Sequence, residues 1–125
     1  MIIKGTVTGG LGEGSRFLMK EGYVKQFRKK LGFVPYPGTL NIRTEMKLPD
    51  NPTCAIEGFT EDGNVYGRVL CYRARLIHGT RREECFIVRP ALATDDGIVE
   101  LVHKENLRRR MDLKDEEEVG VEILP

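Results

Sequence analysis

The segment from Gly32 to Ile42 has the residue types and spacing best suited to holding a cation. It reads Gly-Phe-Val-Pro-Tyr-Pro-Gly-Thr-Leu-Asn-Ile. The prolines fix φ and the glycines permit a sharp turn, so a stiff corner is expected to lead into a strand. Thr39 and Asn41, two residues apart, project from the same face of that strand. Their oxygens suit a hard cation that keeps water or phosphate oxygens as further ligands. The simpler interpretation is a rigid turn followed by two ordinary polar residues.

A glycine-rich loop upstream is the second unusual segment. Residues 8–16 read Thr-Gly-Gly-Leu-Gly-Glu-Gly-Ser-Arg, which matches neither a Walker A sequence nor a dinucleotide-binding fingerprint. Its glycines nevertheless allow backbone N–H groups to approach an anion closely. Arg16 would add positive charge for a polyphosphate, and Glu13 could accept a hydrogen bond from a base or ribose. The alternative is a flexible hairpin tip.

A third candidate combines Glu100 with the segment Glu105-Asn106-Leu107-Arg108. A strand carboxylate followed by a polar helix start offers acceptors for ribose or ribityl hydroxyls and donors for a base. The alternative is a solvated face. The two histidines, His78 and His103, stand in turn-like positions without the partners of a Ser-His-Asp set. The chemistry best served by these residues is phosphoryl transfer, which depends on positioning, a divalent ion and charge neutralisation more than on a conspicuous nucleophile.

Short strands dominate the elements expected around these residues. The alternation of apolar and polar side chains predicts strands at 2–7, 39–43, 54–59, 65–77, 84–88, 98–102 and 119–124. Helical spacing predicts a helix over 22–31, closed by Gly32, and a short helix over 105–111. Asp62-Gly63 predicts a hairpin turn. Many short strands with few helices favour a mainly β fold, a small closed or partly closed barrel, over a doubly wound parallel sheet.

Composition narrows the classes of protein. A chain of 125 residues is expected to form a single domain, residues 1–125, and its net charge of +1 gives no general argument for binding nucleic acid or membrane. No apolar run is long enough to span a bilayer, and the N-terminus lacks the layout of a signal peptide. The three cysteines, Cys54, Cys71 and Cys85, form no paired motif. We therefore expect a cytoplasmic protein without disulfides or a structural zinc site.

The order and spacing of three sequence blocks resemble the archaeal CTP-dependent riboflavin kinase family. The blocks are Gly10-Leu11-Gly12-Glu13-Gly14, then Gly32-Phe33-x-Pro35-Tyr36-x-Gly38-Thr39-Leu40-Asn41, then Ile98-Val99-Glu100-Leu101 leading to Asn106-Leu107-Arg108. The resemblance runs from Ile2 to Val121. It implies a six-stranded cradle-loop barrel, and transfer of the γ-phosphate of CTP to the 5′-hydroxyl of riboflavin, giving FMN and CDP.

The resemblance also assigns roles to individual positions. The family's nucleotide-binding segments match Leu11, Gly12, Glu13, Gly14, Ser15 and Arg16, and then Glu105, Asn106, Leu107 and Arg108. Thr39 and Asn41 match its magnesium ligands. Glu100 matches a flavin-binding carboxylate and is our candidate catalytic residue.

The sequence departs from the family at two places near the site. Leu92 stands where the family has a flavin-contacting threonine, and Thr94 is expected to take over that contact. His103-Lys104 replaces the family's Ala-Pro. The implied partners are riboflavin, FMN, CTP and CDP, without nucleic acid or membrane, and a monomer fits. Two other classes stay open: a non-catalytic small barrel that binds nucleotide or flavin, and a DNA-binding barrel of the swapped-hairpin type, which would have a basic face and steep salt dependence.

Overall fold

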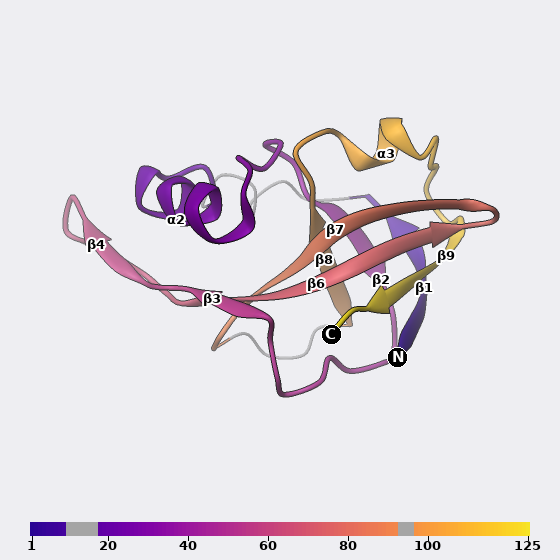
Figure 1. Cartoon of the computed structure of the whole chain (residues 1–125), viewed down its shortest axis with the longest axis horizontal. Coiled ribbons are helices and arrows are strands. Elements are labelled where there is room, and N and C mark those ends of the chain that lie inside the picture. The colour runs from indigo at the N-terminus through magenta and orange to yellow at the C-terminus, as the bar shows by residue number, and fades with distance from the viewer. Residues whose placement is uncertain (10–17, 93–96) are drawn as a thin grey trace.

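Strands make up most of the structure, a computed structural model that describes residues 1–9, 18–92 and 97–125 (Figure 1). In these ranges the strands are β1 (Ile2–Thr8), β2 (Leu40–Arg43), β3 (Cys54–Ile56), β4 (Phe59–Glu61), β5 (Asn64–Tyr66), β6 (Val69–His78), β7 (Arg81–Pro90), β8 (Ile98–Val102) and β9 (Glu118–Ile123). The helices are α2 (Glu21–Leu31) and the short α3 (Leu107–Arg110). The prediction of a mainly β fold with one or two short helices is confirmed.

The main sheet closes on itself into a ring. Its neighbours run β6-β7-β8-β2-β1-β9, and β9 pairs again with β6 through Ala74↔Ile123 to Ile77↔Gly120. Every pairing in the ring is antiparallel. Closure removes the exposed edges that so many short strands would otherwise present. The ring of six strands is the small barrel that the sequence favoured, and β3 extends it at one end by pairing with β6.

Alternation along each strand gives the barrel wall an inner and an outer face. In β2, Leu40 and Ile42 are buried and belong to the cluster that fills the ring, whereas Asn41 between them is only half-buried. β8 repeats the pattern, with Val99 and Leu101 turned inward on either side of Glu100. Since successive side chains of a strand point to opposite faces, Asn41 and Glu100 lie on the outer face.

A second apolar cluster covers part of that outer face. Helix α2 lies beside β3 and the β4–β5 ribbon (Figure 1), and its buried residues are Tyr23, Val24 and Phe27. Tyr23 and Phe27 pack with the outer side chains of β6, β7 and β8, among them Val69, Val88 and Val102. The helix ends as predicted at Gly32, whose φ of 85° is the left-handed conformation of a C-terminal cap. An apolar layer therefore lies outside the barrel, between its outer face and helix α2.

Gly22 allows α2 to pack closely against Phe59 of β4. A Cβ at this position would lie 2.7 Å from the Phe59 ring. Glycine to alanine inside a helix ordinarily gains up to about 1 kcal/mol, but overpacking costs about 1–3 kcal/mol. We expect Gly22→Ala to lower the free energy of unfolding by about 1 kcal/mol, measured by urea denaturation. Lys25→Ala, on an exposed part of the same helix, is the control and should change little. A stabilised Gly22→Ala variant would contradict the close packing.

Four predicted elements differ from those observed. The strand predicted over 54–59 is divided into β3, which ends at Ile56 and pairs with β6, and β4, which begins at Phe59 and pairs with β5. The strand predicted over 65–77 is broken in the same way: β5 ends at Tyr66 and pairs only with β4, and β6 begins at Val69. At the break the backbone of residues 66–68 lies close to Gly58, where a Cβ would be 2.5 Å from the Tyr66 carbonyl oxygen. The strand predicted over 84–88 extends to Arg81–Pro90, since Arg81 and Arg82 pair with the end of β6. The helix predicted over 105–111 is limited to Leu107–Arg110.

No helix within the described ranges has both the length and the apolar character needed to cross a membrane.

Candidate active site

Thr39, Asn41 and Glu100 form a compact group of oxygen atoms on the outer face of the barrel. Asn41 and Glu100 stand opposite each other in the β2–β8 pairing. The Thr39 hydroxyl oxygen lies 2.9 Å from Asn41 Oδ1 and 3.3 Å from Glu100 Oε1, and its single proton can be donated to one of them at a time. The stiff corner therefore places the Thr39 side chain beside those of Asn41 and Glu100. The two predicted metal ligands, Thr39 and Asn41, thus lie next to the predicted flavin-binding carboxylate of Glu100.

The chemistry of this group fits a hard divalent cation. Hydroxyl, amide and carboxylate oxygens are the ligand types that Mg²⁺ takes alongside water and phosphate oxygens. All three residues are partly exposed, so a ligand and water can reach them. Elsewhere in the described ranges, no group of three or more His, Cys, Asp and Glu side chains is placed to hold a metal ion.

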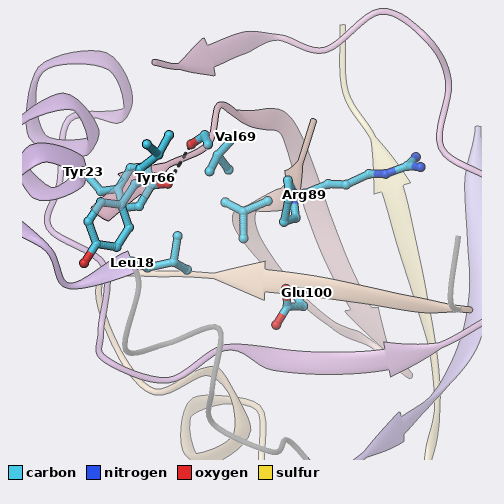
Figure 2. Close-up of a pocket in the computed structure, with 10 residues that line it drawn as sticks. Leu18, Tyr23, Tyr66, Val69, Arg89 and Glu100 are labelled. Carbon is cyan, nitrogen blue, oxygen red and sulfur yellow. Dashed lines mark hydrogen bonds between the residues drawn. The ribbon is translucent and has the colours of Figure 1, made fainter. Parts of the chain in front are cut away.

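A pocket of about 250 Å³ opens beside this oxygen group (Figure 2). It is lined by Leu18, Tyr23, Val65, Tyr66, Gly67, Val69, Val88, Arg89, Pro90 and Glu100. Figure 2 shows Tyr23 and Tyr66 at one end and Glu100 at the other, while the Arg89 guanidinium points away from the two tyrosines. The volume is slightly below the roughly 300–1,000 Å³ typical of ligand pockets. The pocket therefore suits the apolar ring portion of a ligand whose polar portion extends past Glu100.

The aromatic end of the pocket is held in place by neighbouring rings. Phe59 and Tyr66 face each other across the β4–β5 hairpin and stack with ring centroids 4.9 Å apart. Tyr23 meets Phe59 edge-on at 4.7 Å, and its hydroxyl donates to the Gly67 carbonyl at 2.6 Å. Burial, reinforced by nearby Tyr66, raises the pKa of Tyr23, so this hydroxyl stays a donor at neutral pH. Offset and edge-to-face pairs of this kind favour a fixed wall against which a flat ligand can pack.

The segment from Glu105 to Arg108, which leads into helix α3, lies near the oxygen group. Asn106 caps the helix, accepting a hydrogen bond from the Arg109 N–H at 3.1 Å. Leu107 is buried in the main core, so its side chain is not open to a ligand. Arg108 pairs with Asp115 at 2.9 Å and also donates to the Thr8 carbonyl at 3.4 Å. Since Thr8 lies beside Asn41 in the β1–β2 pairing, Arg108 approaches the oxygen group from the other side.

Two predicted sites lie outside the described residues. They are the nucleotide loop, Leu11, Gly12, Glu13, Gly14, Ser15 and Arg16, and the flavin contact Thr94. The described chain on either side of the loop is nevertheless placed: Thr8 neighbours Asn41, and Leu18 lines the pocket. Leu92, just before the second undescribed range, has a side chain that is 95% exposed. The roles predicted for the nucleotide, metal and flavin residues stay predictions.

A charged network lies between β7 and the Glu105–Arg108 segment. The His103 Nε2 atom is 3.0 Å from Glu83 Oε1, and Arg110 pairs with both Glu83, at 2.9 Å, and Glu105. Burial raises the pKa of Glu83, but the hydrogen bonds from Arg110 and His103 outweigh it, so the pKa lies below its ordinary value of 4.5. Glu83 is therefore ionised at neutral pH and attracts both partners.

The Glu83 network predicts a pH-dependent stability. Because the folded pKa is lowered, the ionised carboxylate stabilises the fold above its unfolded pKa, and this contribution is lost as the pH falls through the folded value. We expect Glu83→Gln to lower the free energy of unfolding by about 1–2 kcal/mol at pH 7, and by much less at pH 3. Urea denaturation at both pH values measures this, with Glu45→Gln, at an exposed position, as the control. A difference that is equal at both pH values would contradict the lowered pKa.

Sequence reasoning missed the aromatic wall and the network around His103. One signal for the first was present: a two-residue turn at Asp62-Gly63 places Phe59 opposite Tyr66. A second signal was Tyr23, an aromatic residue next to the apolar face of the predicted helix. No local signal pointed to His103, whose partner Glu83 comes from another strand.

A closed ring of six strands, with an aromatic pocket beside a group of polar oxygens, defines a small-barrel protein with a candidate ligand site on its outer wall. A family model named CTP-dep_RFKase, described as "Domain of unknown function DUF120", matches residues 7–123. The chain therefore belongs to the CTP-dependent riboflavin kinase family, as its sequence blocks indicated.

Curated relatives agree with this family. The chain is 39% identical to a riboflavin kinase of Archaeoglobus fulgidus over 129 residues, covering 98% of this chain and 54% of that protein. It is 40% identical to a riboflavin kinase of Ignicoccus hospitalis over 126 residues, covering 95% and 69%. It is 34% identical to a riboflavin kinase of Haloquadratum walsbyi over 132 residues, covering 98% and 56%. The chain thus spans little more than half the length of most of these relatives.

Proposed function

We propose that this chain is a riboflavin kinase that uses CTP as phosphoryl donor and produces FMN and CDP. The observation that carries the proposal is the position of Glu100. Its side chain lines the aromatic pocket, and its carboxylate oxygen lies 3.3 Å from Thr39, which in turn contacts Asn41. An apolar site for a flat ring is thereby joined directly to a group of oxygens suited to a cation and phosphates. A kinase that phosphorylates the end of a flavin side chain needs these two sites side by side.

Riboflavin would place its isoalloxazine ring in the pocket against Tyr23 and Tyr66, with the ribityl chain running past Glu100. Acceptor oxygens on Glu100 suit the hydroxyls of that chain. The 5′-hydroxyl then arrives near Thr39 and Asn41, where the triphosphate of the nucleotide would lie. Membership of the family and the names of the relatives support this choice of substrates.

Thr39 and Asn41 would hold Mg²⁺, which would neutralise phosphate charge during the transfer. In the reaction the riboflavin 5′-oxygen forms a bond to the γ-phosphorus, and the bond from that phosphorus to the β–γ bridging oxygen breaks. CDP leaves, and the hydroxyl proton passes to solvent. Because such a transition state is loose, little early proton abstraction is required. We therefore assign Glu100 mainly to orienting the ribityl chain rather than to acting as a base.

The nucleotide would be held by the 11–16 loop and by the Glu105–Arg108 segment. Arg108 supports this arrangement, because it meets the Thr8 carbonyl at the start of the loop. Its charge would also attract the polyphosphate. The cytoplasmic location expected from the sequence stays a prediction.

The test is incubation of the chain with riboflavin, Mg²⁺ and either CTP or ATP, with FMN and CDP measured by chromatography. FMN formed in proportion to CDP is the expected result. Riboflavin binding without any FMN would overturn the kinase in favour of a non-catalytic flavin-binding barrel. Salt-sensitive DNA binding without flavin binding would favour the swapped-hairpin class instead.

A further inference from the structure

His103 touches both segments that the proposed function assigns to ligands. It follows β8 and is 8% exposed; among the described residues, only His103 and Thr44 are both polar and buried. Its ring and its backbone carbonyl each make a separate contact. Both ring nitrogens have hydrogen-bond partners, and a buried polar group that is satisfied in this way holds its neighbours in fixed positions.

The ring of His103 holds the start of the Glu105–Arg108 segment. The Glu105 backbone N–H donates to Nδ1 at 2.9 Å. Nδ1 must therefore carry a lone pair, which leaves the proton on Nε2. That proton is donated to Glu83 at 3.0 Å, and Glu83 is in turn held by Arg110. The orientation of the ring is thus fixed from β7, and the ring fixes the backbone at Glu105.

The backbone of His103 holds the Pro/Gly corner. Its carbonyl accepts from the Tyr36 N–H at 2.7 Å. Tyr36 lies between the two prolines, and its carbonyl accepts from the Gly38 N–H at 2.7 Å, just before Thr39. The Asn106 side-chain amide also donates to the Tyr36 hydroxyl, at 3.4 Å. The corner and the Glu105–Arg108 segment are therefore connected in two ways: through His103, and by the hydrogen bond between Asn106 and Tyr36.

We propose that His103 is a positioning residue, which fixes the distance between the Thr39–Asn41 corner and the Glu105–Arg108 segment so that one nucleotide can contact both. The proposal rests on the proposed function. His103 itself faces Glu83 and the Glu105 backbone and contacts no ligand group. Its loss should weaken nucleotide binding and leave the flavin pocket, on the far side of Glu100, unchanged.

Two substitutions separate the contacts of the ring. His103→Phe keeps an aromatic ring of similar shape but loses both ring hydrogen bonds. His103→Asn can place an oxygen close to the position of Nδ1, so it keeps the acceptor for the Glu105 N–H while losing the Glu83 contact. The control is His78→Phe, because His78 also pairs with a glutamate, Glu117 at 2.9 Å, but contacts neither of the two segments.

The expected result is a KM for CTP raised about tenfold or more in His103→Phe, partly restored in His103→Asn, with the KM for riboflavin unchanged in both. His78→Phe should match the parent. An unchanged KM for CTP in a folded His103→Phe variant would overturn the proposal, as would an equal rise in both KM values.

A measurement without substrates separates this proposal from the proposed function. In the free protein, nitrogen-15 NMR should find the His103 proton on Nε2, and amide hydrogen exchange at Glu105 should be about tenfold faster in His103→Phe than in the parent or His103→Asn. A proton on Nδ1, or equal exchange in all three proteins, overturns the positioning role even if FMN is formed. If the parent forms no FMN while these signatures hold, the kinase assignment fails and the structural coupling stands.

Discussion

The Thr39→Ala/Asn41→Ala double variant is expected to lose about 100-fold or more in kcat while keeping its fold and its affinity for riboflavin. Removing groups that neutralise charge in a transition state, or that hold a metal, typically costs about this much. Thr39 and Asn41 are two of the three residues in the oxygen group on the outer wall, and neither lines the aromatic pocket. Turnover at saturating Mg²⁺ and riboflavin binding by fluorescence quenching measure the two effects separately.

The matched control for this double variant is Asn51→Ala/Thr60→Ala. It removes the same two side-chain types from exposed positions that do not line the pocket. It should retain the parent rate. If the Thr39→Ala/Asn41→Ala variant also turned over at the parent rate with Mg²⁺, the metal assignment would be wrong. A loss of riboflavin affinity as large as the loss of kcat would instead point to collapse of the whole site.

Glu100→Ala is expected to reduce kcat/KM for riboflavin about 10- to 100-fold, and Glu100→Gln about tenfold or less. A hydrogen bond to a charged group contributes about 1.5–3 kcal/mol, and each 1.4 kcal/mol corresponds to about a tenfold change. Glutamine keeps the length of the side chain and one acceptor oxygen between the pocket and Thr39, so it should still orient the ribityl chain. Steady-state kinetics with riboflavin as the varied substrate give both values.

The size of the Glu100→Gln effect also distinguishes the two roles of this carboxylate. A general base contributes about 10²–10⁴-fold, and glutamine cannot take a proton. A fall in kcat beyond about 1,000-fold in Glu100→Gln, with unchanged riboflavin affinity, would identify a base and refute the orienting role. Glu45→Gln, at an exposed loop position that does not line the pocket, is the control and should behave as the parent.

Several elements could be predicted from sequence because their causes are local. The strand at Ile2–Thr8, the helix ending at Gly32 and the turn at Asp62-Gly63 depend on side-chain alternation, helical spacing and turn residues. The shared face of Thr39 and Asn41 follows from the period of a strand. The helix predicted over 105–111 was wrong at both ends, because the helix begins only after its cap, Asn106. Leu107, its first residue, packs into a core supplied by distant strands.

The candidate site could be predicted only in part, for a physical reason. Thr39, Asn41 and Glu100 were each found from residue type and family spacing, but their contact requires β2 to pair with β8. The pocket requires α2 and the β4–β5 ribbon to pack on the outer wall. Such pairings are selected by burial of apolar surface and by the long-range closure of the chain, which no short window of residues contains.

The sequence by itself determined the mainly β character of this chain, the stiff corner before Thr39, the position of Thr39 and Asn41 on one face and the family to which the chain belongs. Only the tertiary structure decided that β9 closes the ring on β6, that Glu100 joins an aromatic pocket to the polar oxygens, and that His103 binds the corner to the Glu105–Arg108 segment. The first set rests on interactions between near neighbours along the chain. The second depends on side chains that meet only after the barrel has closed and its two apolar clusters have been buried.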